Sequence, residues 1–500
     1  MKAYIILFLI FTITPVISQE NSVGIFDNNL VAGNSEKAGY STYDSEDQTY
    51  TLNGVGSNVE QDKINYLYNL IKGDFIITAN IQFKDEGTVP SSKVGLMIRE
   101  SQDEGAAYAK AVLHADGSTF FQWRESVTSM DREDQISSPK TNYGIFQLER
   151  KGEEIIMRAA HWGEPLQVIG SKDSPLPAGE VLVGLFIDSP NGEVVETATA
   201  WNVRIDKPVA NDYDPGEEGW LGCRLETINV ENGMRKQIYE KEDRFEAPNW
   251  MPGGDELLFN MDGSLYTINV EGGDPEKFDT GFADNLNNDH GISFNGEMIA
   301  ISHHPPGEGS KVYVLPIEGG TPRLVTDEDP SYWHGWAPNN EEVVYVATRE
   351  NNPTYDIYKK SIHGGEEVAL TNTGEGEHVD GCEYSPDGEY IYYNGSASGT
   401  MQIWRMRPDG SNKEQLTFDA RNDWFPHISP DGKWIAYISF PSEIPVNDHP
   451  SYKRVTLNLM PTAGGAPKVI AYLYGGQGSI NVPSWSPDSK HLAFVSNSGK

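Results

Sequence analysis

The sequence predicts an all-β protein. An N-terminal β-sandwich of jelly-roll type is followed by a six-bladed β-propeller that closes by pairing of its N- and C-terminal half-blades. Three observations support this fold class. Two kinds of tight turn recur through the second half of the chain, alternating strand patterns fill the first part, and helical periodicity is scarce. The 50 Gly and 30 Pro residues also suit many short strands joined by turns.

Residues 380–410 contain one complete unit of the repeat. This segment has β-prone runs separated by a Ser-Pro-Asp-Gly turn at 385–388 and an Asp-Gly turn at 409–410. The Tyr-rich run at 390–393 favours a strand, and Pro-Asp-Gly supplies the backbone angles of a tight turn. A single small sheet cannot bury both of its faces, so we expect the unit to repeat.

The order in which the turns recur predicts ring closure. The turn between the first two strands of a unit recurs at residues 252–254, 294–296, 338–340, 386–388, 430–432 and 487–489. The turn between the last two strands recurs at residues 232–233, 272–273, 319–320, 364–365, 409–410 and 464–465. The region therefore opens with the second half of a blade and ends with the first half of one. Pairing these halves closes a six-bladed ring over residues 219–500 and leaves no long exposed sheet edge.

These turn sequences resemble a known repeat. Residues 384–388 (Tyr-Ser-Pro-Asp-Gly), 428–434 (Ile-Ser-Pro-Asp-Gly-Lys-Trp) and 485–489 (Trp-Ser-Pro-Asp-Ser) are similar to the WD40-like, or PD40, repeats of the TolB propeller family. The resemblance covers a little over half of the chain and implies a propeller, a fold that hosts many functions. TolB itself works with a peptidoglycan-associated lipoprotein in the cell envelope. The region before the repeats, however, does not resemble TolB's own α/β domain.

Residues 19–206 lack the repeat and carry strand patterns of their own. Alternating or β-branched runs predict strands at 75–83, 94–99, 107–113, 120–124, 144–150, 154–158 and 181–186. Turns such as 115–117 and 151–152 join neighbouring runs. Many strands with few helices indicate an antiparallel sandwich of jelly-roll type.

Four segments of this first domain are similar to concanavalin-like sandwich domains of the DUF1349 type. They are Gly-Val-Gly-Ser-Asn at 54–58, Gly-Asp-Phe at 73–75, Gly-Leu-Met-Ile-Arg at 95–99 and Gln-Trp-Arg at 122–124. Such domains often accompany proteins that act on carbohydrate. Trp123 and Arg124 could offer an aromatic and cationic face to a glycan. The alternative is that Trp123 belongs to the core and Arg124 is solvated.

The remaining segments set the domain boundaries and the expected location. Residues 207–218, with two Pro, one Gly and four acidic residues, are expected to form a linker. Residues 1–18 predict a secretory signal peptide, because Lys2 precedes an apolar run at 5–13 and a cleavage-site pattern follows at 16–18. That run is too short to span a membrane, and no other segment is suited to it. We expect an exported protein, periplasmic or secreted, with no transmembrane segment.

Charge and cysteine content limit the partners. The 38 Lys and Arg residues face 74 Asp and Glu residues, for a net charge of −36. Nucleic acid and anionic membrane surfaces are therefore excluded as partners. The two cysteines, Cys223 and Cys382, fall in predicted strands of different blades and are expected to be buried free thiols. We expect a monomer.

Aligning the blades on their first turn predicts a site at one mouth of the channel. The aligned position holds Pro248, His290, His334, Cys382, Pro426 and Pro483. First strands line the axis of a propeller, so these positions converge on one mouth, where His290 and His334 replace the common Pro. The residues predicted around them are Asp289, Trp333, His378, Asp380, Glu383, Trp424 and His427. Clustered imidazoles and carboxylates are typical of sites for metals and sugars.

Several chemistries are open at this mouth. His290, His334 and Asp380 could hold a divalent metal, the one candidate cofactor, that polarises a uronate carboxylate or activates water. They could also act as acid and base without a metal. Sugar binding alone is a further alternative, with Trp333 and Trp424 as stacking platforms. A structural role is also consistent with the sequence: the histidines would bond neighbouring backbone, and the tryptophans would pack between blades.

Three hypotheses for function follow. The first is an exported binding protein that holds an oligo- or polysaccharide at the propeller mouth. The second is a carbohydrate-active lyase or hydrolase, and the third is an interaction scaffold for a cell-envelope protein. The sequence contains no His-Glu-x-x-His, no Cys-x-x-Cys pair, no EF-hand loop and no Gly-x-Ser-x-Gly elbow. A serine peptidase is therefore not expected.

Overall fold

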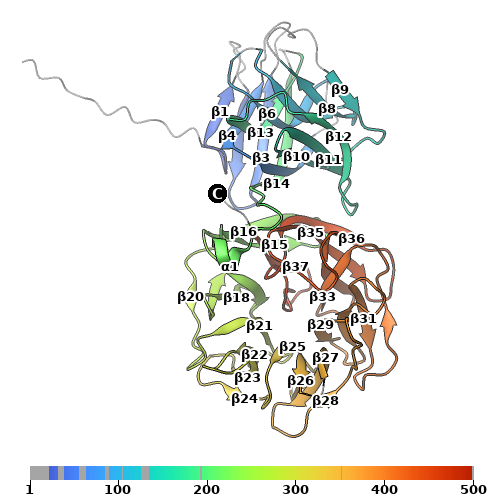
Figure 1. The fold of residues 1–500 in the computed structure, drawn as a ribbon. Helices are drawn as coiled ribbons and strands as arrows, with labels where there is room; N and C mark the ends of the chain where they lie inside the picture. Colours follow the sequence, from blue (N-terminus) through green and yellow to red (C-terminus); the bar gives the residue numbers. More distant parts are fainter. Residues whose placement is uncertain are drawn as a thin grey trace, which may run out of the picture.

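The chain folds into two β domains, one standing on the rim of the other (Figure 1). The computed structural model describes residues 22–31, 39–55, 64–84, 89–103, 105–125, 134–191, 194–350 and 352–497. The predicted signal peptide at 1–18 lies outside these ranges. Within them the single helix is α1 (Pro215–Glu218), and no helix there has the length and apolar character needed to cross a membrane. The predicted fold class, a sandwich followed by a six-bladed propeller, is confirmed.

The first domain consists of two seven-stranded antiparallel sheets. The first sheet runs in the order β1 (Asn28–Val31), β4 (Asn65–Lys72), β13 (Glu180–Asp188), β6 (Lys93–Arg99), β7 (Tyr108–His114), β8 (Thr119–Arg124) and β9 (Asp134–Ser137). The second runs in the order β12 (Gln167–Asp173), β11 (Glu154–Ala160), β10 (Ile145–Lys151), β5 (Phe75–Phe83), β14 (Val195–Asp206), β3 (Thr49–Val55) and β2 (Tyr40–Asp44). Apolar side chains from both sheets, among them Ile77, Leu96 and Phe146, form one fully buried core between them.

Five complete blades and one composite blade make the propeller. The complete blades are β17 (Glu246–Trp250), β18 (Glu256–Met261), β19 (Ser264–Asn269) and β20 (Glu276–Lys277); β21 (Leu286–Ile292), β22 (Met298–His303), β23 (Lys311–Pro316) and β24 (Arg323–Leu324); β25 (Ser331–Trp336), β26 (Glu342–Arg349), β27 (Asn352–Ser361) and β28 (Val368–Ala369); β29 (Val379–Tyr384), β30 (Ile391–Gly395), β31 (Gln402–Met406) and β32 (Glu414–Gln415); and β33 (Asn422–Ile428), β34 (Trp434–Phe440), β35 (Lys453–Pro461) and β36 (Lys468–Gly475). The innermost strands β21, β25, β29 and β33 surround the axis in Figure 1.

The composite blade closes the ring as the turn order predicts. It pairs β16 (Arg235–Lys241) and β15 (Cys223–Asn229), from the start of the propeller, with β37 (His491–Asn497) from its end. Its innermost strand is reduced to an isolated bridge between Trp485 and Leu492. Cys223 and Cys382 are both buried free thiols, as the sequence indicates.

The Ser-Pro-Asp-Gly turns are fixed by their own side chains. The Ser385 hydroxyl donates to a carboxylate oxygen of Asp387 at 2.6 Å and accepts from the backbone N–H of Tyr390 at 3.0 Å. Gly388 has a φ of 71°, a left-handed conformation that glycine adopts without strain. Because this bonding is local to the motif, it sets the register between the first two strands wherever the motif occurs.

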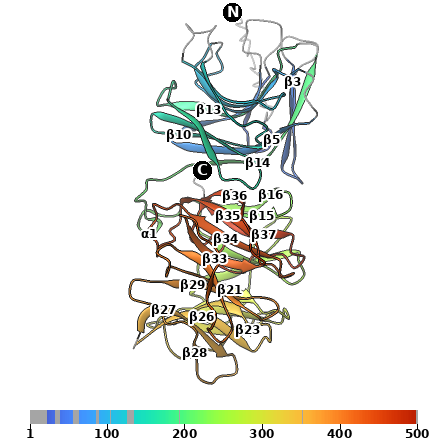
Figure 2. The ribbon, with the colours of Figure 1, turned by 90° about the vertical axis from the view of Figure 1, so that its right-hand side faces the viewer.

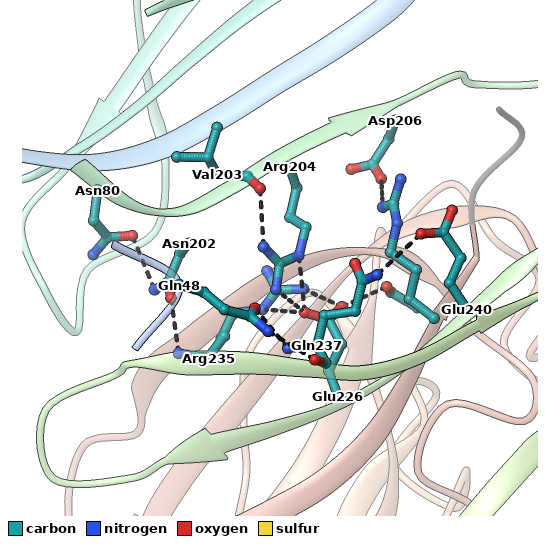
Figure 3. A network of polar contacts seen from close by, with 12 residues as sticks. Gln48, Asn80, Asn202, Val203, Arg204, Asp206, Glu226, Arg235, Gln237 and Glu240 are labelled. Carbon is teal, nitrogen blue, oxygen red and sulfur yellow. Dashed lines mark hydrogen bonds and ion pairs between the residues drawn. The ribbon is translucent and has the colours of Figure 1, made fainter. Parts of the chain in front are cut away.

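A buried carboxylate joins the two domains and the closing blade (Figure 3). Glu226 of β15 accepts two hydrogen bonds from Arg204 of sandwich strand β14, at 3.0 and 2.7 Å. It also accepts from Arg235 of β16 at 3.2 and 2.6 Å, and from the Ser496 hydroxyl of β37 at 2.6 Å. Burial would raise the pKa of Glu226, but Arg204 and Arg235 outweigh burial and lower the pKa to about 2.

Further polar contacts fix how the sandwich sits on the rim of the ring. Figure 2 shows sandwich strand β14 facing the outer strands of the composite blade and of the last complete blade. The side-chain amide of Gln48 exchanges hydrogen bonds with the backbone of Gln237 at 2.8 and 2.9 Å. The backbone N–H of Val469 donates to the carbonyl of Gly163 at 3.1 Å, forming a β-bridge between the domains. These contacts hold the two domains in a defined orientation.

Replacing Glu226 with Gln is expected to lower the free energy of unfolding by about 3–5 kcal/mol, because two buried guanidinium groups lose their counter-charge. The folded pKa of about 2 lies below the ordinary value of 4.5, so the Glu226 carboxylate stabilises the fold above pH 4.5. This contribution is lost as pH falls from 4.5 towards 2. Wild type should therefore lose more stability on acidification than E226Q, as measured by urea unfolding followed through tryptophan fluorescence.

The control is Glu389→Gln, which breaks an exposed pair. Glu389 lies 3.2 Å from Arg407, with side chains 60% and 39% exposed. This change should alter the free energy of unfolding by less than about 1 kcal/mol. Equal unfolding free energies for E226Q and wild type would contradict the role given to Glu226.

Candidate functional site

A small polar pocket lies where the first strands of several blades begin. We call it the polar pocket; it has a volume of about 230 Å³. It is lined by Asn287, Asn288, Asp289, Tyr332, His334, Val346, Tyr355, His378, Asp380, Phe425, Asn447, His449, Gln477 and Asn481. Strands β21, β25 and β29 and the loops at 441–452 and 476–481 supply most of these residues. All but Val346 and Phe425 carry polar side chains.

Asp380 is the centre of an imidazole cluster in this pocket. Its carboxylate lies 2.7 Å from His334 Nε2, 3.6 Å from His378 Nε2 and 4.0 Å from His449 Nε2. Burial raises the pKa of Asp380, but His334 and then His378 outweigh burial and hold the pKa well below its usual range. Burial lowers the pKa of His334, but Asp380 and Asp289 reverse the effect and raise the pKa. Asp380 therefore carries a negative charge in the pocket at neutral pH.

Asp289 is the second carboxylate of the polar pocket, and its pKa is shifted in the opposite direction to that of Asp380. It accepts a hydrogen bond from the side-chain amide of Asn287 at 2.5 Å. Burial raises the pKa of Asp289 to about 7, with His334 opposing the rise and Asp380 adding to it. Two carboxylates in one pocket thus differ in charge near neutral pH, since Asp380 is ionised and Asp289 is partly protonated.

The structure brings together Asp289, His334, His378 and Asp380 among the predicted residues, but His290 does not line the pocket. The His290 side chain is buried, and burial lowers its pKa to about 4, so the imidazole is neutral at physiological pH. The predicted metal ligands His290, His334 and Asp380 therefore do not converge on one space. Among the described residues, no group of three or more His, Cys, Asp or Glu side chains is arranged to hold a metal ion.

Glu383 and His427 form a separate pair between blades. His427 Nδ1 lies 2.7 Å from a Glu383 carboxylate oxygen, and His427 Nε2 lies 2.8 Å from the carbonyl oxygen of Ile480. The other Glu383 oxygen accepts from the backbone N–H of Ile428 at 3.1 Å. Glu383 lines a different, more apolar cavity of about 450 Å³. These two residues therefore do not share the polar pocket with Asp380.

The predicted tryptophan platforms are covered by protein. Trp333 is 1% exposed and Trp424 is 0% exposed, so neither ring offers a free face to a sugar. The ring of Trp424 packs against that of His449, with centroids 4.4 Å apart. Both tryptophans pack between blades, which is the structural alternative that the sequence left open.

The two sandwich residues predicted to contact a glycan, Trp123 and Arg124, both pack against neighbours in their own domain. Arg124 is buried, donates to the carbonyl of Ala106 at 2.9 Å, and lies over the Tyr108 ring at 4.6 Å from its centroid. Trp123 is half-buried and packs against Phe121, with ring centroids 5.3 Å apart. Trp123 and Arg124 therefore lie on opposite faces of β8, as neighbours in a strand do.

Several lining residues of the polar pocket were not predicted. His449 and Asn447 come from the 441–452 loop, which the other blades lack and which has no position in the repeat alignment. Tyr332 and Tyr355 lie on β25 and β27 and carry no motif that marks them. The signal that could have identified His449 is its place in the one long insertion of the propeller, because long loops often carry contacts.

Comparison with known proteins identifies the family of the propeller. No family model matches the chain. An uncharacterised protein of Agrobacterium fabrum is 44% identical over 281 residues, which are 56% of this chain and 94% of that protein. A solved structure from Agrobacterium tumefaciens, provisionally named TolB, is 44% identical, covers 55% of this chain and 98% of that chain, and has a TM-score of 0.52. This chain belongs to the TolB-like propeller family.

The TolB-like assignment concerns fold. TolB of Acinetobacter baumannii is a more distant likeness, with 14% identity over 56% of this chain and 64% of that chain and a TM-score of 0.38. A similarity of that size adds nothing to the argument. Family membership therefore places a TolB-like propeller in this chain, and any function has to be argued from the site.

Replacing Asp380 with Asn is expected to lower the pKa of His334, because Asp380 is the largest influence that raises it against burial. The imidazole should then titrate at lower pH than in wild type. The measurement is a pH titration of the histidine ring nitrogens by NMR, with the His334 signal assigned from a His334→Gln variant.

Asp431→Asn is the matched control for this titration. Asp431 lies on an exposed turn between β33 and β34, outside the polar pocket, and pairs with Lys433 at 2.8 Å. This change should leave the His334 titration where it is in wild type. A His334 pKa that is the same in D380N and wild type would show that the 2.7 Å contact is not an ion pair in solution.

Proposed function

We propose that this protein is an exported TolB-like propeller that binds a carbohydrate in the polar pocket. The observation that carries the proposal is the composition of the lining: amides, phenol rings, imidazoles and carboxylates converge on about 230 Å³. Vicinal hydroxyls of a sugar both donate and accept hydrogen bonds, and these side chains match both roles. The volume lies below the roughly 300–1,000 Å³ typical of sites for drug-sized ligands. The pocket would therefore hold one sugar unit of a longer chain.

The charged groups of the polar pocket limit the class of sugar that it can bind. Asp380 is ionised, and Asp289 becomes ionised as pH rises through about 7. A uronate carboxylate placed against these groups would meet like charge, which disfavours binding. The imidazolium of His334 is already paired with Asp380 at 2.7 Å, so it offers a uronate carboxylate little attraction against this repulsion. A unit that presents hydroxyl groups is therefore preferred over an acidic sugar.

The proposed location is periplasmic or extracellular. The support is the signal-like segment at residues 1–18, with Lys2 before an apolar run, together with the TolB-like family of the propeller. N-terminal sequencing of the exported protein tests this location directly.

A second candidate function is acid–base catalysis on a glycan, as in a lyase or hydrolase. The observation that favours it is the contrast between Asp289, with a pKa of about 7, and Asp380, with a pKa well below its usual range. Carboxyl groups whose environments push their pKa values apart can serve as acid and base. In this mechanism Asp289 would donate a proton, and the ion pair of Asp380 with His334 would orient the substrate.

A thermal-shift screen of the full chain against neutral and acidic oligosaccharides tests the binding proposal. A neutral oligosaccharide at a hundred times its dissociation constant should stabilise wild type by about 2.7 kcal/mol. Asp380→Asn should weaken binding at least about tenfold, because a hydrogen bond to a charged group is worth about 1.5–3 kcal/mol. Asp431→Asn should bind as wild type does. An unchanged affinity in D380N would show that the ligand does not bind in the polar pocket.

The absence of any shift would contradict both carbohydrate functions. An envelope-protein scaffold would then become the leading hypothesis, and affinity capture with the full chain would follow.

Product analysis tests the catalytic candidate. An oligosaccharide that binds is incubated with wild type and with Asp289→Asn, and the products are separated by chromatography. If Asp289 is the acid, activity falls as pH rises through about 7, where Asp289 loses its proton. Asn at this position should abolish turnover while binding persists. Binding without products from wild type would leave the protein a binding protein only.

A further inference from the structure

A second cavity lies where the sandwich meets the propeller. We call it the junction cleft; it has a volume of about 410 Å³. Residues from strands β5 and β14 and from the turns between sandwich strands form most of its wall, and Asn232, from the turn between β15 and β16, closes it on the propeller side. Figure 2 shows β5 and β14 above β15 and β16 at the domain boundary.

The lining of the junction cleft carries no strong charge. Among the described residues that line it there is no Asp, Glu, Lys or Arg, although the chain as a whole has a net charge of −36. Amide side chains take the polar positions, among them Gln82, Asn142 and Asn232. The basic groups in this lining are the imidazoles of His114 and His161, and His161 Nδ1 lies 3.1 Å from a Glu164 carboxylate oxygen. A wall without carboxylate, ammonium or guanidinium groups favours an uncharged polar ligand.

Two tryptophans give the cleft an aromatic wall. Trp162 lines the cleft and is 37% exposed, one of the few large rings that this chain leaves open to solvent. Trp201 also lines the cleft, and its indole N–H is buried with no hydrogen-bond partner among the described residues. Buried N–H groups are normally paired, so this unpaired donor is unusual, although it is covered from solvent.

The aromatic wall is held rigidly before any ligand arrives. A Cβ atom added at Gly233 would lie 2.2 Å from the Trp162 ring, so the propeller turn braces this ring. His161 stacks on Tyr143 with centroids 4.6 Å apart, and its Nε2 lies 2.9 Å from the carbonyl oxygen of Thr141. A site that is ordered in advance loses little entropy when a ligand binds.

We propose that the junction cleft is a second carbohydrate site, which takes an uncharged glycan stacked on Trp162. The apolar C–H face of a neutral sugar suits an indole ring, and its hydroxyls suit the amides that line the cleft. The proposal does not depend on the function proposed for the polar pocket. The two sites share no lining residue, and only the polar pocket contains carboxylates.

The test is calorimetric titration of the full chain with cellohexaose, chitohexaose and mannohexaose. We expect at least one of these neutral glycans to bind. Trp162→Ala should weaken that binding at least about tenfold, because an aromatic ring that anchors a ligand carries much of the binding energy. Phe418→Ala is the matched control, because Phe418 is 77% exposed and lies away from the cleft. Affinity should also be nearly constant between about 50 mM and about 500 mM sodium chloride, since no charge pairs form.

Two further variants keep the result interpretable. Gln82→Ala removes an exposed amide from the cleft without touching the domain interface and should weaken binding by about two- to tenfold. Asp380→Asn alters only the polar pocket and should leave binding at the cleft unchanged. The proposal is overturned if none of the three glycans binds, or if binding survives both W162A and Q82A. Binding lost in D380N but kept in W162A would assign the glycan to the polar pocket alone.

Discussion

The structure depends on the environment of one buried carboxylate. Glu226 is bonded by Arg204 from the sandwich, by Arg235 from the neighbouring strand and by Ser496 from the last strand of the propeller. Removing a charge from water costs several kcal/mol, and the cost is offset only when every partner is in place. A ring without β37, or a propeller without its sandwich, would leave the carboxylate or a guanidinium short of partners. Ring closure and domain docking are therefore coupled, and docking also places Asn232 of the propeller against the sandwich residues that form the rest of the junction cleft.

The chemistry of the channel follows from the direction of its strands. At one end the first strands begin with polar residues such as Asp289, His334 and Asp380, which form the polar pocket. At the other end the turns supply Pro386, Pro430 and their counterparts, which line a more apolar cavity. Every blade contributes the same register positions to the same end, so a substitution at one position of the repeat changes one end of the channel. The polar character of this end comes from several positions of the first strands and from loop residues, since of the two aligned histidines only His334 lines the polar pocket.

Sequence reasoning succeeded where local chemistry decides structure. The Ser-Pro-Asp-Gly turns bond their own backbone, so their order was enough to predict the ring and its closure. His334 and Asp380 were predicted together because they occupy nearby register positions on adjacent blades. The prediction that the Trp333 ring is an open stacking platform is wrong. A bulge between Trp333 and Gly335 decides which face of the strand that ring takes, and such bulges leave no clear mark in a sequence. His449 lies in an insertion and Trp162 in a turn between sandwich strands, both outside the repeat, so the repeat alignment gives neither residue a place at a site.

The fixed orientation of the two domains also determines how the two proposed sugar sites would act together. Two sites joined by a flexible linker engage one polymer at an effective concentration that falls as the linker lengthens. Here Glu226, together with the Gly163–Val469 bridge, holds the sandwich on the propeller, so the separation of the sites is fixed. If both proposed sites bind the same glycan, a fixed separation would favour glycans long enough to reach both sites and would give shorter ones no advantage. The polar pocket would then recognise the sugar unit that it encloses, and the uncharged cleft would add affinity for the glycan that contains this unit. If both sites bind as proposed, the domain interface is part of the recognition surface as well as a structural joint.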